Sequence, residues 1–201
     1  MPPASEDRRH TEQGRERKQQ LVEAAMALFA ERGYAATRII DICEAAGVAK
    51  GLFYWYFPTK LDLFAELVRT MRRRLRVAQA EAMTAGAPPV QRIREGAEAS
   101  VRFMAENAAY FALVEMERTD PEVAKLLQEG SEIYLDDVVA LVREAQGDGD
   151  LPDVEPRLVA LGVLGTVSTF SNGWRHGRVN VTVDELAAFV GEWVERSLAA
   201  G

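Results

Sequence analysis

The segment from Lys50 to Lys60 concentrates side chains that could contact double-stranded DNA. If the segment is helical, Val48, Phe53 and Phe57 fall on one side of it. The other side carries a second set: Lys50, Gly51, Leu52, Tyr54 and Trp55. Amphipathic rings and an ammonium can reach phosphates, and aliphatic or aromatic edges can meet thymine methyl groups in the major groove. The pattern therefore predicts a recognition helix that presents this second set to the groove.

Three further residues are expected to contact phosphates: Thr37, Tyr56 and Lys60. Thr59 is followed three residues later by Asp62, which predicts a capping box at the start of a new helix. Lys60 stands at the first position of that helix, where free backbone N–H groups and the ammonium together would make a phosphate site.

A helix and a tight turn must precede the recognition helix and position it. Thr37 is a plausible N-cap, Ile39, Ile42 and the pair 45–46 form an apolar stripe, and Gly47 supplies the turn. These elements make a helix-turn-helix. An earlier helix, predicted over residues 15–32, would pack across both and complete a three-helix head.

The stretch from Thr37 to Leu63 resembles the DNA-binding domain of the TetR family of bacterial transcriptional repressors. The matching residues are Thr37, Ile42, Ala46, Gly47, Val48, Gly51, Tyr54, Tyr56, Phe57, Lys60 and Leu63. Cys43 stands where alanine is usual, and Ala49 stands where serine is usual, so Ala49 is expected to contribute no more than a backbone contact. The resemblance implies a homodimeric regulator that binds a palindromic operator.

Composition restricts the remaining possibilities. The chain has 201 residues, of which 48% are hydrophobic and 27% charged, so it is expected to be globular. It shows neither a long apolar run nor the apolar centre of a secretory signal, which predicts a cytoplasmic protein. A single cysteine excludes a disulfide framework, and we expect Cys43 to be an inert core residue, with a redox-sensitive thiol as the alternative. With two histidines and one cysteine, no metal site and no cofactor are expected.

The net charge of −7 is unevenly distributed. Residues 1–65 contain nine basic and nine acidic residues, so the negative excess lies in residues 66–201. DNA binding would then depend on a local basic surface around Lys50, Lys60 and the basic residues that begin the chain. Residues 1–14 are expected to form a flexible arm that either contacts DNA or serves only as a solubilising tail.

Helical spacing continues through the rest of the chain, so we predict an all-α protein in which residues 15–62 form the DNA-binding domain and residues 63–201 a helical effector-binding and dimerisation domain. A long helix over residues 59–83 would join the two. Further helices are predicted over residues 90–107, 108–118, 121–146, 156–176 and 183–199. Arginines cluster from Arg72 to Arg76; we interpret them as a solvated face, or alternatively as a holder for an anionic ligand.

The last two predicted helices favour dimerisation. Small residues line one side of residues 156–176, and small residues allow a second helix to approach closely. A four-helix bundle made by two subunits would use both helices, unless they only cover the core of a monomer. The expected interface residues are Leu161, Gly165, Ser168, Leu186, Val190 and Trp193.

The family resemblance also implies a cavity for a small effector in the C-terminal domain. Apolar and aromatic residues that could line it, or could be ordinary core residues, are Phe103, Met104, Tyr110, Phe111, Met116, Tyr134, Phe170 and Trp174. The effector is expected to be apolar or amphipathic, for instance an acyl-CoA or another lipophilic anion.

The resulting hypothesis is a repressor that releases DNA when its effector binds. A constitutive or activating DNA-binding protein with a vestigial pocket is the alternative. An all-helical enzyme using Glu115, Glu117 and Asp120 is a weaker one, because the sequence shows no nucleophile–base pair, phosphate loop or metal-ligand spacing, and we therefore expect no enzymatic activity.

Overall fold

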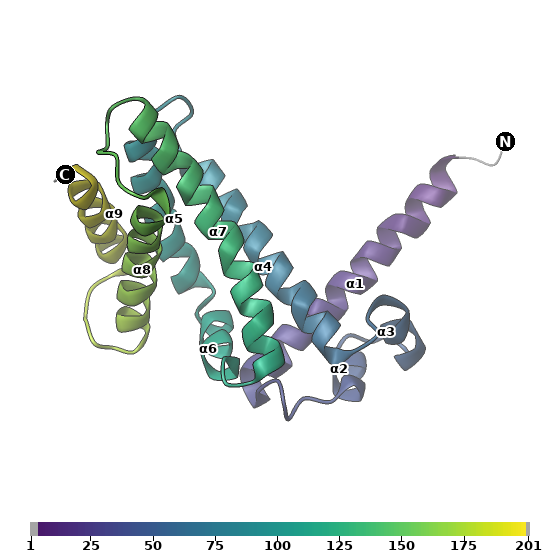
Figure 1. Cartoon of the computed structure of the whole chain (residues 1–201). Coiled ribbons are helices and arrows are strands. Elements are labelled where there is room, and N and C mark those ends of the chain that lie inside the picture. Colours follow the sequence, from purple (N-terminus) through teal and green to yellow (C-terminus); the bar gives the residue numbers. More distant parts are fainter. Residues whose placement is uncertain (1–3, 200–201) are drawn as a thin grey trace. The chain divides into compact units, whose positions relative to one another are not determined.

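The computed structural model describes the backbone of residues 4–199 and the side chains of residues 12–199. The regular secondary structure of this part of the chain is entirely helical (Figure 1). The helices are α1 (Ala4–Arg32), α2 (Ile39–Ala45), α3 (Lys50–Tyr56), α4 (Lys60–Ala82), α5 (Pro89–Glu106), α6 (Ala108–Glu117), α7 (Pro121–Gly147), α8 (Pro156–Arg175) and α9 (Val183–Ala199). The predicted all-α class is confirmed. None of the helices in this part of the chain combines the length and apolar character needed to cross a membrane.

Local capping explains why the later helices begin where the sequence predicts. The Thr59 backbone N–H donates to the Asp62 carboxylate (3.0 Å), and the Asp62 N–H donates back to the Thr59 hydroxyl (3.1 Å). Thr182 and Glu185 make the same reciprocal pair at the start of α9. At the start of α7, Asp120 accepts the backbone N–H of Glu122 (2.9 Å) ahead of the proline-led turn.

Two helix starts differ from the sequence prediction. Helix α1 begins at Ala4 and not at residue 15, so most of the expected flexible arm has a helical backbone; residues 1–3 and the side chains of residues 4–11 lie outside the described part. Helix α2 is capped by Arg38 and not by Thr37, because the Arg38 N–H donates to Asp41 (3.2 Å). The Thr37 hydroxyl instead donates to the carbonyl of Gly33 (2.8 Å), where a positive φ of 81° turns the chain back.

Packing divides the chain into two compact units. The first comprises residues 1–70 and 109–127, and the second comprises residues 71–108 and 128–201. Helices α4 and α7 each contribute to both units. The first unit is therefore larger than the three-helix head that the sequence motif marks out, because residues 109–127 pack with that head.

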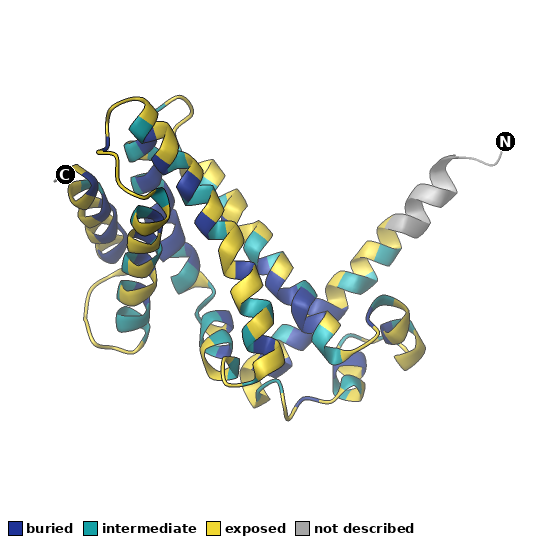
Figure 2. Cartoon of the chain, in the orientation of Figure 1, coloured by how far each residue is buried: buried dark blue, intermediate teal, exposed yellow. Residues whose placement is uncertain are grey.

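The core of the first unit joins α1 to the helix-turn-helix and to the start of α4 (Figure 2). Its fully buried side chains include Leu21, Phe29, Ile42, Phe53, Leu63 and Phe64. The rings of Phe29 and Phe64 lie 5.9 Å apart, and Tyr34 packs against both. Burying these large apolar side chains fixes the short helices, which are too short to be stable alone.

The second unit is centred on α5, which packs closely against α8 and α9. Gly191 of α9 allows the closest approach: a Cβ atom there would lie 2.5 Å from the Glu98 carboxylate of α5. Glu98 is also an ion-pair partner of Arg94 (3.1 Å) and Arg102 (3.5 Å). Those two arginines reach across to α9, at Glu195 (2.9 Å) and Asp184 (3.0 Å) respectively. Gly191 thus admits Glu98 and its ion-pair network between the two helices.

Replacing Gly191 by alanine is expected to lower the free energy of unfolding by about 1 kcal/mol, because displacing Glu98 costs about 2 kcal/mol and alanine returns about 1 kcal/mol of helix propensity. Gly173→Ala in α8 is the control, since a Cβ there meets nothing within 4 Å. That control is expected to stabilise by up to about 1 kcal/mol. Urea unfolding of both variants measures the difference; equal stabilisation of the two would contradict the packing argument.

Candidate nucleic-acid interface

Helix α3 is anchored by its inner face and exposes its outer face. Gly47, with φ of 65°, makes the turn after α2, and the Val48 N–H donates to the Cys43 carbonyl (3.0 Å) to close it. Phe53 is completely buried, whereas 47% of Tyr54 and 75% of Trp55 remain exposed. Of the five predicted groove residues, Lys50, Gly51, Tyr54 and Trp55 are exposed and Leu52 is partly buried.

The exposed aromatic side chains are held by one another. The rings of Trp55 and Tyr56 are 4.6 Å apart and nearly perpendicular at 84°. Lys50 holds its ammonium 5.9 Å from the centroid of the Tyr54 ring, and no carboxylate among the described residues pairs with it. A tryptophan this exposed, beside an unpaired ammonium, is typical of a binding surface.

Packing within the chain does not require glycine at position 51. A Cβ atom there would meet nothing within 4 Å. Glycine inside a helix costs about 1 kcal/mol relative to alanine. The missing side chain therefore favours close approach by something outside the chain, as expected where a helix lies against DNA.

Lys60 has a different environment from the one the sequence predicted. Its ammonium donates to the carbonyls of Tyr34 (2.6 Å), Ala35 (3.3 Å) and Thr37 (2.9 Å), and lies 4.3 Å from the Tyr34 ring centroid. Burial lowers its pKa, and the charge of Glu117 opposes that shift. An ammonium has three N–H donors, and the three carbonyls use all of them.

The loop between α1 and α2 is also held by α6. The backbone N–H of Tyr34 donates to the carboxylate of Glu117 (2.9 Å), the last residue of α6. Burial, followed by the charges of Asp120, Glu122 and Glu117, raises the pKa of Tyr34 to about 12, so its hydroxyl stays neutral at physiological pH. Thr37, in the same loop, is only 1% exposed. The predicted phosphate contacts of Thr37 and Lys60 are untested, and these internal bonds argue against both.

Three other basic residues of the first unit, Lys18, Arg38 and Arg69, have carboxylate partners. Lys18 and Arg69 both pair with Glu66 (3.1 and 3.0 Å), which lowers the pKa of that carboxyl despite its partial burial. Arg38 pairs with Asp41 (2.6 Å). These pairs reduce the positive charge that the three residues offer, so Lys50 is a better candidate than any of them for attracting DNA.

Comparison with known proteins agrees with this geometry. Residues 21–67 match the model for bacterial regulatory proteins of the tetR family, and residues 86–196 match that for tetracyclin repressor-like C-terminal domains. The chain belongs to the TetR family. It is therefore a DNA-binding transcriptional regulator, and the segment that matches the first model contains all of α2 and α3.

Two curated TetR-family relatives differ in how they act. The transcriptional activator FasR of Mycolicibacterium smegmatis is 28% identical over 151 residues, which is 74% of this chain and 68% of FasR. The probable acrEF/envCD operon repressor of Escherichia coli K12 is 35% identical over 101 residues, which is 49% of this chain and less than half (46%) of the repressor. Both are transcriptional regulators.

Solved structures show the same fold at low identity. The fatty acid degradation regulator FadR of Bacillus halodurans gives a TM-score of 0.79 at 22% identity, covering 90% of this chain and 96% of that one. FadR of Bacillus subtilis, in complex with stearoyl-CoA, gives 0.77 at 21% identity, covering 88% and 96%.

The eight residues predicted to line an effector cavity belong to both units, and their place at a common cavity stays a prediction. Tyr110, Phe111 and Met116 belong to the first unit, and Met116 is largely exposed. Phe103, Met104 and Tyr134 belong to the second. Phe170 joins an aromatic cluster with Phe189 (5.4 Å) and Trp193, and Trp174 donates to the Val181 carbonyl (2.9 Å), which secures the turn before α9. These contacts account for both aromatic residues without a ligand.

A small cavity of the second unit lies among α4, α5, α7 and α8, and its volume is only about 30 Å³. It is lined by Gln79, Met83, Ile93, Gly96, Ala97, Ser100, Val138, Leu141, Val163, Leu164 and Val167. The Gln79 amide donates to Ser100 (2.9 Å), which donates to the Gly96 carbonyl (2.6 Å). The Met83 methyl lies against bare Gly96, at 2.5 Å from where a Cβ would be. Polar Gln79 and Ser100 within apolar stripes were the sequence signal for this cavity.

The salt dependence of DNA binding distinguishes the two lysines. Lys50→Met is expected to flatten the plot of log affinity against log salt by about one unit, because a charge near phosphate is lost. Lys60→Met is expected to leave that slope unchanged and to lower the free energy of unfolding by about 2 kcal/mol, since charge-assisted hydrogen bonds to carbonyls are lost. Fluorescence anisotropy with a duplex selected from a random library measures the slopes. A flatter slope for Lys60→Met would support the predicted contact between Lys60 and a phosphate.

Gly51→Ala tests close approach. The variant is expected to be more stable by about 0.5–1 kcal/mol and yet to bind the selected duplex at least tenfold more weakly, because the added methyl separates α3 from its target. Thermal unfolding and anisotropy give the two values. Gly173→Ala, outside the first unit, is the control for the propensity gain; unchanged DNA affinity in Gly51→Ala would contradict the interface.

Proposed function

We propose that this TetR-family regulator is a repressor that binds a palindromic operator as a homodimer and leaves it when an amphipathic effector binds the second unit. The observation that carries the proposal is the outer face of α3, where Gly51 has no packing role and Trp55 is three-quarters exposed. Such a face has the shape and chemistry for a major groove.

A second copy of the chain is the proposed partner for the outer faces of α8 and α9. Leu158 and Leu161 of α8 are exposed, as are Phe189 (49%) and Trp193 (51%) of α9. Gly162 and Gly165 lie on the same exposed side of α8, and a Cβ at either would meet nothing within 4 Å of its own chain. Apolar side chains around unneeded glycines favour close helix-to-helix contact across a two-fold axis.

The predicted interface needs one correction. Leu186 and Val190 are buried in the core of the second unit and are not available to a partner. They lie on the inner side of α9, whereas Phe189 and Trp193 lie on its outer side. Leu161, Gly165, Ser168 and Trp193 are exposed and stay in the proposal, and Phe189 joins them.

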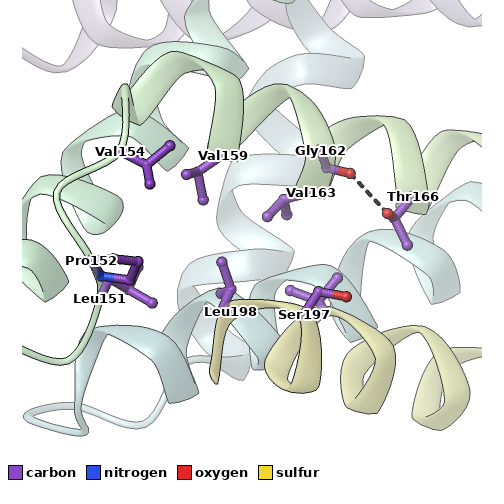
Figure 3. A pocket seen from close by; sticks show the side chains of 10 residues that line it. Leu151, Pro152, Val154, Val159, Gly162, Val163, Thr166, Ser197 and Leu198 are labelled. Atoms are coloured by element: carbon purple, nitrogen blue, oxygen red, sulfur yellow. Dashed lines mark hydrogen bonds between the residues drawn. The ribbon is translucent and has the colours of Figure 1, made fainter. Parts of the chain in front are cut away.

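An open apolar groove of about 380 Å³ adjoins this face (Figure 3). Val159, Gly162 and Thr166 line it from α8, and Ser197 and Leu198 line it from α9. At one end it is lined by residues of the preceding loop: Leu151, Pro152 and Val154. The Thr166 hydroxyl donates to the Gly162 carbonyl (2.8 Å), so the wall presents its methyl group and bare backbone. The groove extends the apolar area that a second copy would cover.

A dimer matters for DNA recognition because two recognition helices about 34–36 Å apart can enter successive major grooves on one side of the duplex. The effector then acts only if it binds one conformation more tightly than the other. The stearoyl-CoA complex of B. subtilis FadR supports an amphipathic acyl compound as the class to test first.

Activation is the second candidate, and one observation favours it: FasR, which matches 74% of this chain, is a transcriptional activator. Selection of duplexes from a random library at moderate salt, followed by reporter assays with the recovered site upstream of or within a promoter, separates the two. A palindromic site and lower reporter output support repression; higher output supports activation, and recovery of no preferred duplex would contradict both.

Dimerisation is tested by Gly165→Leu, which is expected to raise the dimer dissociation constant at least tenfold without loss of fold, because the new side chain projects only toward the partner. Gly147→Leu, at the exposed end of α7, is the matched control. Sedimentation equilibrium gives the constants and circular dichroism the helix content. A dimer in Gly165→Leu as tight as in the control would exclude this face as the interface.

A further inference from the structure

Within the second unit, α4 and α7 lie side by side and run in the same direction (Figure 1). Arg76 of α4 pairs with Asp137 of α7, with N–O distances of 2.9 and 3.0 Å. Beyond this pair, Gln79 and Met83 line the small cavity together with Val138 and Leu141 of α7. These contacts fix the register of the two helices.

The same register brings Arg72 and Tyr134 opposite each other, since each lies about one turn before a member of the Arg76–Asp137 pair. The charges of Arg72 and Arg76 both act on the Tyr134 hydroxyl and favour its ionised form, although burial outweighs them and raises its pKa. Arg72 and Tyr134 are both partly buried. Asp137 is the acidic group that acts on this hydroxyl, and it is already bound to Arg76.

Neither Arg72 nor Tyr134 has a hydrogen-bond partner among the described residues, and Arg72 has no carboxylate partner there. Three nearby arginines differ, since each has a side-chain partner. Arg69 pairs with Glu66 and Arg76 with Asp137. Arg74 lies over the Phe103 ring and donates to the Met71 sulfur. A guanidinium removed in part from water and left without an anion is unfavourable, and it binds carboxylates and phosphates strongly.

We propose that Arg72 and Tyr134 bind the anionic head of an amphipathic ligand, a carboxylate or a phosphate, whose aliphatic tail lies along α4 toward Gln79 and Met83. The guanidinium supplies paired N–H donors and the phenol a further O–H donor. Both Arg76 and Asp137 are about half exposed, so their ion pair lies at the surface. The aliphatic tail would therefore pass beneath this ion pair, on the inner side of α4.

The tail needs space that the cavity does not yet provide, because its volume of about 30 Å³ holds no more than a water molecule. Met83 supplies a means of opening it. Its flexible side chain covers Gly96, and methionine changes rotamer at low cost. From Arg72 to Met83 the helix rises about 16 Å, which sets the reach of a ligand bound at both places.

The site specifies the chemical class of the effector in the proposed function, and the inference therefore rests on that function. The test measures binding and DNA release separately. The full-length protein is titrated calorimetrically with laurate, lauroyl-CoA, CoA alone and dodecanol, using wild type, Arg72→Gln, Tyr134→Phe and Arg73→Gln. Arg73→Gln is the matched control, because it removes the same charge from the neighbouring, exposed position.

Laurate or lauroyl-CoA is expected to bind wild type and Arg73→Gln alike, at least tenfold more weakly to Arg72→Gln, and several-fold more weakly to Tyr134→Phe. Laurate binding alone identifies a carboxylate head, and lauroyl-CoA binding alone identifies phosphate. Equal affinity of Arg72→Gln and Arg73→Gln, dodecanol binding as tightly as laurate, or no binding of either acyl anion would overturn the site. Binding with the expected mutant pattern but no loss of affinity for the selected duplex would support the site and contradict the effector role.

Discussion

The proposed DNA-binding surface depends on one partly buried cation, the ammonium of Lys60. The ammonium of Lys60, at the first residue of α4, donates to three carbonyls of the loop between α1 and α2. That loop leads into the helix-turn-helix, so a single side chain ties the start of α4 to the start of α2. Glu117 of α6 binds the same loop from its backbone N–H side. The orientation of the recognition helix therefore rests on polar contacts to main-chain atoms as well as on the aromatic core.

Much of this architecture could be predicted from sequence because local interactions determine it. Reciprocal capping by Thr59 with Asp62 and by Thr182 with Glu185 depends only on residues three apart, so spacing alone locates those helix starts. Apolar periodicity likewise identified Phe53 and Phe57 as the inner face of α3. Sequence spacing does not predict the direction in which a long polar side chain points. The Lys60 side chain points toward the loop between α1 and α2, because three carbonyls of that loop accept its hydrogen bonds.

Prediction of the second unit was less complete for a related reason. Helix α9 carries apolar residues on two sides, and periodicity does not say which side faces its own core. Leu186 and Val190 fill that core, whereas Phe189 and Trp193 remain exposed. Aromatic residues were also weak indicators of a cavity, since Phe170 and Trp174 have partners within the fold. The cavity is lined instead by the Gln79 amide, the Ser100 hydroxyl and Gly96. Their packing is close, and we propose that it opens when a ligand binds.

Cys43 has a practical consequence for measuring how the protein moves. It is the one cysteine in the sequence; its side chain is buried beside the turn of the helix-turn-helix, and burial raises its pKa, so the reactive thiolate is scarce. A thiol-directed spin label or fluorophore would therefore react selectively with a cysteine introduced on the surface, without first removing the natural one. Distances between labelled positions in the two subunits of the proposed dimer could then be followed in solution, with the native sequence around α3 left intact.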